Sequence, residues 1–150
     1  MKIIKKNPKD VDAIMLMDDL SESLENITGA SGKNSFDSND VLVPRSLFVI
    51  AYDDSGQAIG CGAIRPINEY TAEVKRMFAK VKDLGIGTKI LKHLETEARN
   101  MGYTSLLLET RVINKAAVNF YRKNNYIQIK NYGKYTNNLE AICFEKSLDK

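Results

Sequence analysis

The chain has 150 residues, of which 43% are hydrophobic and 27% charged, with only three prolines. This length matches one domain, and the composition excludes the disordered and fibrous classes. The formal charge of +3 comes from basic residues spread along the chain, so nucleic acid is not an expected partner. The longest apolar runs, such as Leu106–Leu108, are far shorter than the roughly 20 residues of a membrane span. We expect one domain over residues 1–150 and no membrane partner.

The two cysteines, Cys61 and Cys143, lie far apart in the sequence, each within an apolar, strand-like segment. This arrangement disfavours a disulfide framework and a clustered-cysteine zinc site, so no metal is expected. Buried free thiols in a reducing cytosol fit the pattern best. The charged N-terminus is not followed by an apolar segment of signal-peptide length. The sequence therefore predicts a cytoplasmic protein.

The N-terminal part begins with residues 2–5, which predict a short strand. Apolar residues then recur near helical spacing between residues 10 and 20, which predicts a first helix. Residues 21–40 are rich in Ser, Asn, Gly and Asp, and we expect a short second helix followed by a loop there.

The central part predicts a hairpin and a third strand. Residues 46–52 and 57–65 are apolar segments that flank the turn sequence at residues 53–56, Asp-Asp-Ser-Gly. Residues 72–79 (AEVKRMFA) alternate in polarity, as a strand does, and we expect them in the centre of the sheet.

The period then changes from that of a strand to that of a helix over residues 86–98, and Gly102 marks the end of this helix. Residues 104–110 predict a strand buried on both faces, and residues 115–124 a further helix. Two last strands fit residues 126–130 and 141–147. Antiparallel strands followed by alternating strands and helices predict a mixed α/β sheet, mostly antiparallel, of about six or seven strands flanked by helices.

A glycine-containing loop at residues 82–88 (KDLGIGT) stands between a predicted strand and a predicted helix. Glycine lets a backbone approach a ligand closely, and free N–H groups at a helix start attract an anion such as a pyrophosphate. Glycines in such a turn can also serve tight packing alone. The order of residues is wrong for a P-loop, and the third glycine of a dinucleotide-binding fingerprint is missing.

Together with a second motif downstream, this loop resembles the GNAT superfamily of N-acetyltransferases, over about residues 57–129. The family's Gln/Arg-x-x-Gly-x-Gly/Ala motif is matched by residues 82–87, with Lys82 in place of Gln or Arg. Asn125 stands where the family commonly has glycine before an aromatic residue. The second motif is matched by Asn114, Ala117, Val118, Phe120, Tyr121 and Tyr126.

The resemblance implies a GNAT-like fold and acetyl-CoA as cosubstrate. It also implies that the pantetheine arm lies beside the central strand and that a backbone N–H near Phe78 or Ala79 polarises the thioester carbonyl. The residues it assigns to coenzyme binding are Met77, Phe78, Ala79, Lys82, Leu84, Gly85, Ile86, Gly87, Thr88, Asn114 and Tyr121.

The resemblance also implies Tyr121 as the general acid that protonates the leaving thiolate. For the base that takes a proton from the amine, the candidate is Glu73, expected on the same strand face as Lys75 and Met77. Each role has an alternative. Tyr121 could only pack its ring, and Glu73 could pair with Lys75 or Arg76. Asn114 could cap the helix that follows it, with or without a role in binding.

Neither motif contains a cysteine, so direct attack on the thioester is expected rather than a covalent acyl-enzyme. The alternative is a non-catalytic sensor that binds coenzyme A on the same fold. The acceptor, a small-molecule or peptide amine, stays open. The acidic residues between positions 18 and 25 could attract a cationic acceptor or form a solvated face, and Tyr132 and Tyr135 could wall the acceptor site or pack beneath a loop. A homodimer through strand pairing near the C-terminus is possible.

Overall fold

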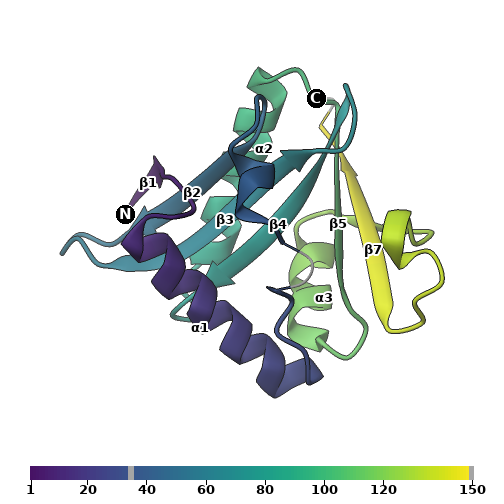
Figure 1. Cartoon of the computed structure of the whole chain (residues 1–150), viewed down its shortest axis with the longest axis horizontal. Coiled ribbons are helices and arrows are strands. Elements are labelled where there is room, and N and C mark those ends of the chain that lie inside the picture. The colour runs from purple at the N-terminus through teal and green to yellow at the C-terminus, as the bar shows by residue number, and fades with distance from the viewer. Residues whose placement is uncertain (34–35, 149–150) are drawn as a thin grey trace.

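The computed structural model describes residues 1–33 and 36–148. Its strands form one seven-stranded sheet in the order β1-β2-β3-β4-β5-β7-β6, in which only β4 and β5 pair in parallel (Figure 1). The predicted mixed, mostly antiparallel sheet is therefore confirmed. The strands are β1 (Lys2–Lys5), β2 (Leu47–Tyr52), β3 (Ala58–Pro66), β4 (Thr71–Ala79), β5 (Ser105–Arg111), β6 (Ile127–Ile129) and β7 (Ala141–Ser147).

The α-helices cover both faces of the sheet. The described helices are α1 (Val11–Thr28), α2 (Ile86–Asn100) and α3 (Lys115–Lys123), with short 3-10 helices η2 (Ser38–Val41) and η3 (Gly133–Tyr135). One core lies under α1, and a second, larger core is formed by α2 and α3 on the opposite face. None of the helices in the described ranges combines the length and apolar character that crossing a bilayer requires.

Helix α1 is longer than the sequence predicted. It begins after Asp10, whose carboxylate accepts a hydrogen bond from the Asp12 amide at 3.0 Å, and ends at Gly29, which has φ 80°. Leu20 and Ser21 are buried in its middle, so tertiary packing carries the helix through a segment whose composition suggested a break. The separate helix expected after residue 20 is thus wrong within the described residues up to 33, and η2 follows later. Residues 34 and 35 of that expectation lie outside the described residues.

Strand β5 departs from the prediction that both its faces are buried. Leu106 and Leu108 are fully enclosed in the core beneath α2 and α3. The alternate residues Ser105, Leu107 and Glu109 are only partly buried. The prediction was wrong because helices α2 and α3 cover one face of β5, whereas its other face borders a cavity near its C-terminal end.

The cysteines lie where the sequence placed them, in strands of the core. Both Cys61 and Cys143 are buried and free. Burial raises the pKa of the Cys61 thiol to about 12, so this side chain stays protonated and unreactive at neutral pH.

A β-bulge interrupts β4. Ala63 pairs with Lys75 and Cys61 with Phe78, so two residues of β4 oppose Gly62 alone. One of them, Arg76, has φ 53°. The bulge shifts the alternation of side chains by one residue, and Met77 packs with the core beneath α2 rather than beside Glu73 and Lys75. The expectation that these three share a face was wrong for Met77 because strict alternation cannot register a bulge.

Asn114 caps α3, since its side-chain oxygen accepts a hydrogen bond from the Ala117 amide at 3.3 Å. We expect Asn114→Ala to lower the free energy of unfolding by about 1 kcal/mol, whereas Asn114→Asp keeps an acceptor at the cap and most of the stability. Urea unfolding of the two variants measures this difference. Equal losses in both would contradict a capping role.

Candidate active site

The parallel strands β4 and β5 are paired along only part of their length. The pairing runs from Thr71↔Ser105 to Glu73↔Leu107 and then stops. Figure 1 shows the two strands diverging from there, with α3 seen between them. The later part of β4, which holds Met77, Phe78 and Ala79, therefore lies beyond its last pair with β5.

A cavity of about 170 Å³, here named the splay cavity, opens at this divergence. It is lined by residues of α1, β4, β5, α3 and the segment after α1. These residues are Leu20, Leu24, Thr28, Ala30, Gly32, Phe36, Val74, Lys75, Arg76, Met77, Glu109, Thr110, Arg111, Asn114, Ala117 and Tyr121. Three sequence-derived site residues, Met77, Asn114 and Tyr121, thus meet around one cavity.

Tyr121 reaches the splay cavity from α3. Its ring packs edge-on against Phe120 and Tyr126, with centroids 5.1 and 5.8 Å apart, and only 8% of the residue is exposed. No partner for its hydroxyl is found among the described residues. Burial, together with the negative charge of Glu109, raises the pKa of the phenol. The hydroxyl therefore stays protonated at neutral pH and is available as a donor.

Glu73 lies outside the splay cavity and is already engaged. Its carboxylate accepts hydrogen bonds from Arg65 Nε at 2.8 Å and from the Tyr132 hydroxyl, and Lys75 Nζ lies 3.9 Å away. The sequence predicted Lys75 as a possible partner of Glu73. It did not predict Arg65 or Tyr132, because contacts between residues far apart in the chain leave no local pattern. Of the two ion pairs considered for Glu73, the one with Lys75 is present, whereas Arg76 binds Met17 and Ser21 instead.

Glu73 borders a second cavity of about 300 Å³, here named the tyrosine pocket. This pocket combines aromatic walls with charged groups that are largely paired with one another. Its lining residues are Phe36, Asp37, Asp40, Arg65, Ile67, Glu73, Tyr132, Gly133, Lys134 and Tyr135. Tyr132 and Tyr135 therefore wall a cavity beside Glu73, and their role at the acceptor site stays a prediction.

Glu109 is a site residue that the sequence analysis missed. It extends from β5 into the splay cavity, and its buried Oε2 has no hydrogen-bond partner among the described residues. Arg111 Nε is 3.7 Å from that oxygen, which is too long for a hydrogen bond. Burial raises the pKa of the Glu109 carboxyl. In the sequence, Glu109 could have been noticed as a single acidic residue near the end of an otherwise apolar strand.

The glycine loop fits an anionic ligand. Gly85 has φ 72°, a left-handed conformation that favours glycine, and the space beside its Cα is open, since a Cβ there would meet no atom within 4 Å. No side chain in the described part of the chain caps the N–H groups of α2. The exposed Lys82 and Lys89 add positive charge. Such a helix start is suited to a diphosphate.

Gly87 serves packing instead. A Cβ at this position would lie 3.2 Å from the Phe120 ring, so the glycine allows α2 to approach α3 closely. Of the two roles considered for the loop glycines, ligand approach fits Gly85 and tight packing fits Gly87. Asn125, which replaces the family's glycine, has φ 70°, a conformation that Asn tolerates better than most residues.

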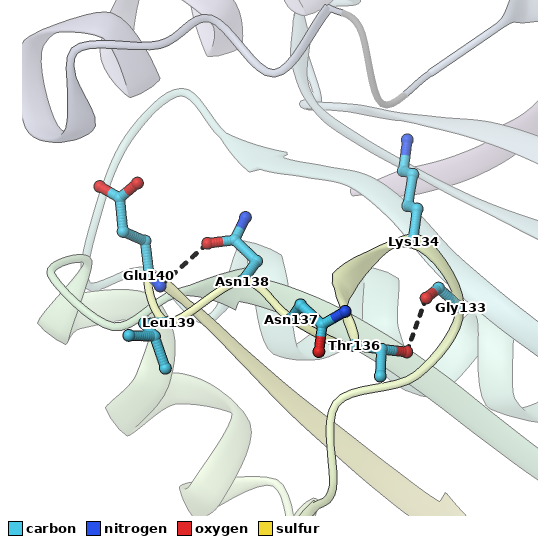
Figure 2. Close-up of a pocket in the computed structure, with 7 residues that line it drawn as sticks. All are labelled: Gly133, Lys134, Thr136, Asn137, Asn138, Leu139 and Glu140. Atoms are coloured by element: carbon cyan, nitrogen blue, oxygen red, sulfur yellow. Dashed lines mark hydrogen bonds between the residues drawn. The ribbon is translucent and has the colours of Figure 1, made fainter.

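A further hollow of about 550 Å³ lies within the loop of residues 133–140 (Figure 2). The loop is held by hydrogen bonds from Thr136 Oγ1 to the Gly133 carbonyl and from the Glu140 amide to Asn138 Oδ1, at 2.7 and 2.9 Å. None of its lining residues lines the splay cavity. This hollow is a surface feature of one loop, not the candidate active site.

Comparison with known proteins agrees with this geometry. The sequence model of the acetyltransferase (GNAT) family matches residues 14–126. A protein from Azospirillum brasilense named IAA acetyltransferase is 32% identical over 149 residues, covering 97% of each chain.

Solved structures share the fold over nearly the whole chain. One from Klebsiella pneumoniae has a TM-score of 0.83 and 25% identity, covering 99% of this chain and 97% of that one. A GNAT family acetyltransferase from Elizabethkingia anophelis, solved with acetyl-CoA bound, has a TM-score of 0.71 at 18% identity and covers 97% of each chain. The family match spans most of the sequence, and this chain belongs to the acetyltransferase (GNAT) family.

Proposed function

We propose that the chain is an acetyl-CoA-dependent N-acetyltransferase in which the splay cavity is the reaction site and all 150 residues form one catalytic domain. One observation carries the proposal. Tyr121, a buried tyrosine, and Glu109, whose Oε2 is buried without a hydrogen-bond partner among the described residues, line the same cavity where β4 and β5 separate. These are a proton donor and a proton acceptor of the kinds that acetyl transfer to an amine needs.

The coenzyme is proposed to bind along the glycine loop and the free part of β4. The N–H groups of residues 84–88, with Lys82, would hold the diphosphate. The backbone of Met77, Phe78 and Ala79 would accompany the pantetheine arm. Asn114 keeps its amide nitrogen for that arm while its side-chain oxygen caps α3.

The chemistry follows from two proton transfers. An alkylamine has a pKa near ~10.4 and must lose a proton before it can attack the thioester carbon. We propose that Glu109 takes this proton, since its Oε2 accepts no hydrogen bond within the described residues whereas Glu73 is held by Arg65 and Tyr132. The new C–N bond forms as the C–S bond breaks. The departing thiolate then takes a proton from the Tyr121 hydroxyl, and the proton that the nitrogen loses on becoming an amide returns through solvent to the Tyr121 phenolate. An N–H near Phe78 or Ala79 stabilises the carbonyl oxygen.

The binding-sensor alternative predicts coenzyme binding without turnover on any amine. The cytoplasmic location remains our proposal, supported by the two free buried thiols. The homodimer also stays a prediction, and β6, at one edge of the sheet, is the strand it would use.

Acetyl-CoA and coenzyme A should each stabilise the protein in a thermal-shift titration. A ligand at 100 times its dissociation constant adds about 2.7 kcal/mol, or roughly 5–10 °C in Tm for a domain of this size. ATP and NAD serve as controls that carry phosphates without the pantetheine arm. A larger shift with either control, or none with the two coenzymes, would contradict the assignment of the glycine loop.

Tyr121→Phe should lower kcat by ~10-fold or more and leave the Kd of acetyl-CoA nearly unchanged, because the ring and its aromatic packing remain while the proton donor is lost. Steady-state kinetics with saturating coenzyme tests this. Tyr70→Phe removes a hydroxyl from an exposed turn and is the matched control. Unaltered turnover in Tyr121→Phe would remove this residue from the mechanism.

A carboxylate base acts only when ionised, so activity should rise with pH through the pKa of Glu109, which burial places above the ordinary carboxyl value. Glu109→Gln should lower kcat/KM by ~10²–10⁴-fold and flatten this rise. Glu73→Gln should leave the rise in place. The pH–rate profiles of the two variants distinguish the two candidate bases. A rise that flattens in Glu73→Gln but persists in Glu109→Gln would make Glu73 the base.

A further inference from the structure

The charge of the splay cavity is unusual for a site that would receive an amine. Three cationic side chains line it, Lys75, Arg76 and Arg111, against the single carboxylate of Glu109. The acidic residues at positions 18, 19, 22 and 25 are not among its lining residues. A polycationic acceptor would therefore meet net repulsion there.

Two of these cations are available to a ligand. Arg76 is held in place instead: its guanidinium donates through Nη2 to the Met17 carbonyl and to Ser21 Oγ at 3.2 and 2.6 Å, although its buried Nε has no hydrogen-bond partner within the described residues. The Arg111 guanidinium makes no hydrogen bond within the described residues, and its Nε lies 3.7 Å from Glu109. Its planar donors are suited to a carboxylate.

Lys75 is the second available cation. Its side chain is 9% exposed, and Nζ donates to the Tyr135 hydroxyl at 3.3 Å. The nearest carboxylate, Glu73, is 3.9 Å away and is already bound by Arg65 at 2.8 Å. Burial lowers the pKa of Lys75, so its charge is only partly compensated. An anionic group from a ligand would stabilise that charge.

The charges of Glu109, Arg111 and Lys75 are complementary to a zwitterion, which carries one positive and one negative group. Glu109 and Arg111 are alternate residues of β5, and Lys75 of β4 lines the same cavity. Both cations interact electrostatically with the Glu109 carboxylate. We propose that the acceptor is an amino acid with an apolar side chain, whose amine faces Glu109 and whose carboxylate binds Arg111 and Lys75. This inference rests on the proposed acetyltransferase function.

The apolar side chain is assigned from the neighbouring tyrosine pocket. Phe36 lines both cavities, so the two adjoin at this ring. The rings of Tyr132 and Tyr135 stack edge-on in the tyrosine pocket, with centroids 5.6 Å apart, and Ile67 adds an aliphatic surface. Arg65, a charged residue there, is paired with Glu73 and Asp40. Asp37 and Lys134 also line the pocket, but most of its surface is apolar and suits the body of the acceptor.

The test compares acceptors that share one body. L-Phenylalanine, L-phenylalaninamide, 2-phenylethylamine and spermidine are assayed with saturating acetyl-CoA, and L-leucine is compared with its amide in parallel. We expect kcat/KM for each amino acid to exceed that for its amide by at least ~10-fold, because charge-assisted hydrogen bonds to the carboxylate are lost in the amide. The amide's amine is the less basic of the two, so a preference for the acid cannot arise from easier deprotonation.

Variants locate the carboxylate site. Arg111→Gln should reduce the acid-to-amide ratio to near 1, mainly through KM, and Lys75→Gln should reduce it in the same direction. Lys92→Gln, an exposed change on α2, is the matched control and should keep the ratio. Arg111 is partly exposed, so its variant preserves the test if the buried Lys75 variant fails to fold.

The outcomes separate the two levels of the proposal. Acetyl transfer that is as fast to the amides or 2-phenylethylamine, or faster to spermidine, would overturn the amino acid acceptor while leaving the enzyme. A preference for the acids that Arg111→Gln leaves intact would also overturn the assigned site. Coenzyme binding without transfer to any amine would overturn the proposed function itself.

Discussion

The structure of the site depends on one constraint, the end of the hydrogen bonding between the parallel strands β4 and β5 after Glu73↔Leu107. A continuous ladder would fill the gap with paired backbone and leave no cavity. The bulge at Arg76 follows closely, and it separates Met77 from Glu73 and Lys75. Helix α3 covers one side of the opening with Tyr121, and the end of α1 covers another with Leu24.

Two glutamates, one buried and one partly buried, show how hydrogen-bond partners decide what a carboxylate can do. Glu73 and Glu109 are the same residue type on neighbouring strands, but Glu73 accepts two hydrogen bonds and Glu109 Oε2 accepts none within the described residues. A carboxylate surrounded by strong donors has its lone pairs occupied by hydrogen bonds, whereas one without such donors keeps a lone pair that can accept a proton. The cations around Glu109 give the cavity a net positive charge, which disfavours a polycationic acceptor.

Much of this fold could be predicted from the sequence, because its strongest signals are local. The apolar stripe of α2, the turn before Gly56 and the alternation in β4 each specified an element to within one or two residues. The errors arose where distant contacts override composition. Packing against the sheet continues α1 past Ser21. Because α2 and α3 cover only one face of β5, alternate residues of this strand stay partly exposed.

By itself, the sequence determined the family, the glycine loop and the position of Tyr121, since these reside in residue types at fixed spacing. Tertiary structure alone decided which carboxylate is free. Arg65 and Tyr132 reach Glu73 from β3 and the loop before η3, and no spacing along the chain records that meeting. The tertiary structure also decided the net charge of the splay cavity. Side chains of β4 and β5 line this cavity together because the two strands first pair and then diverge.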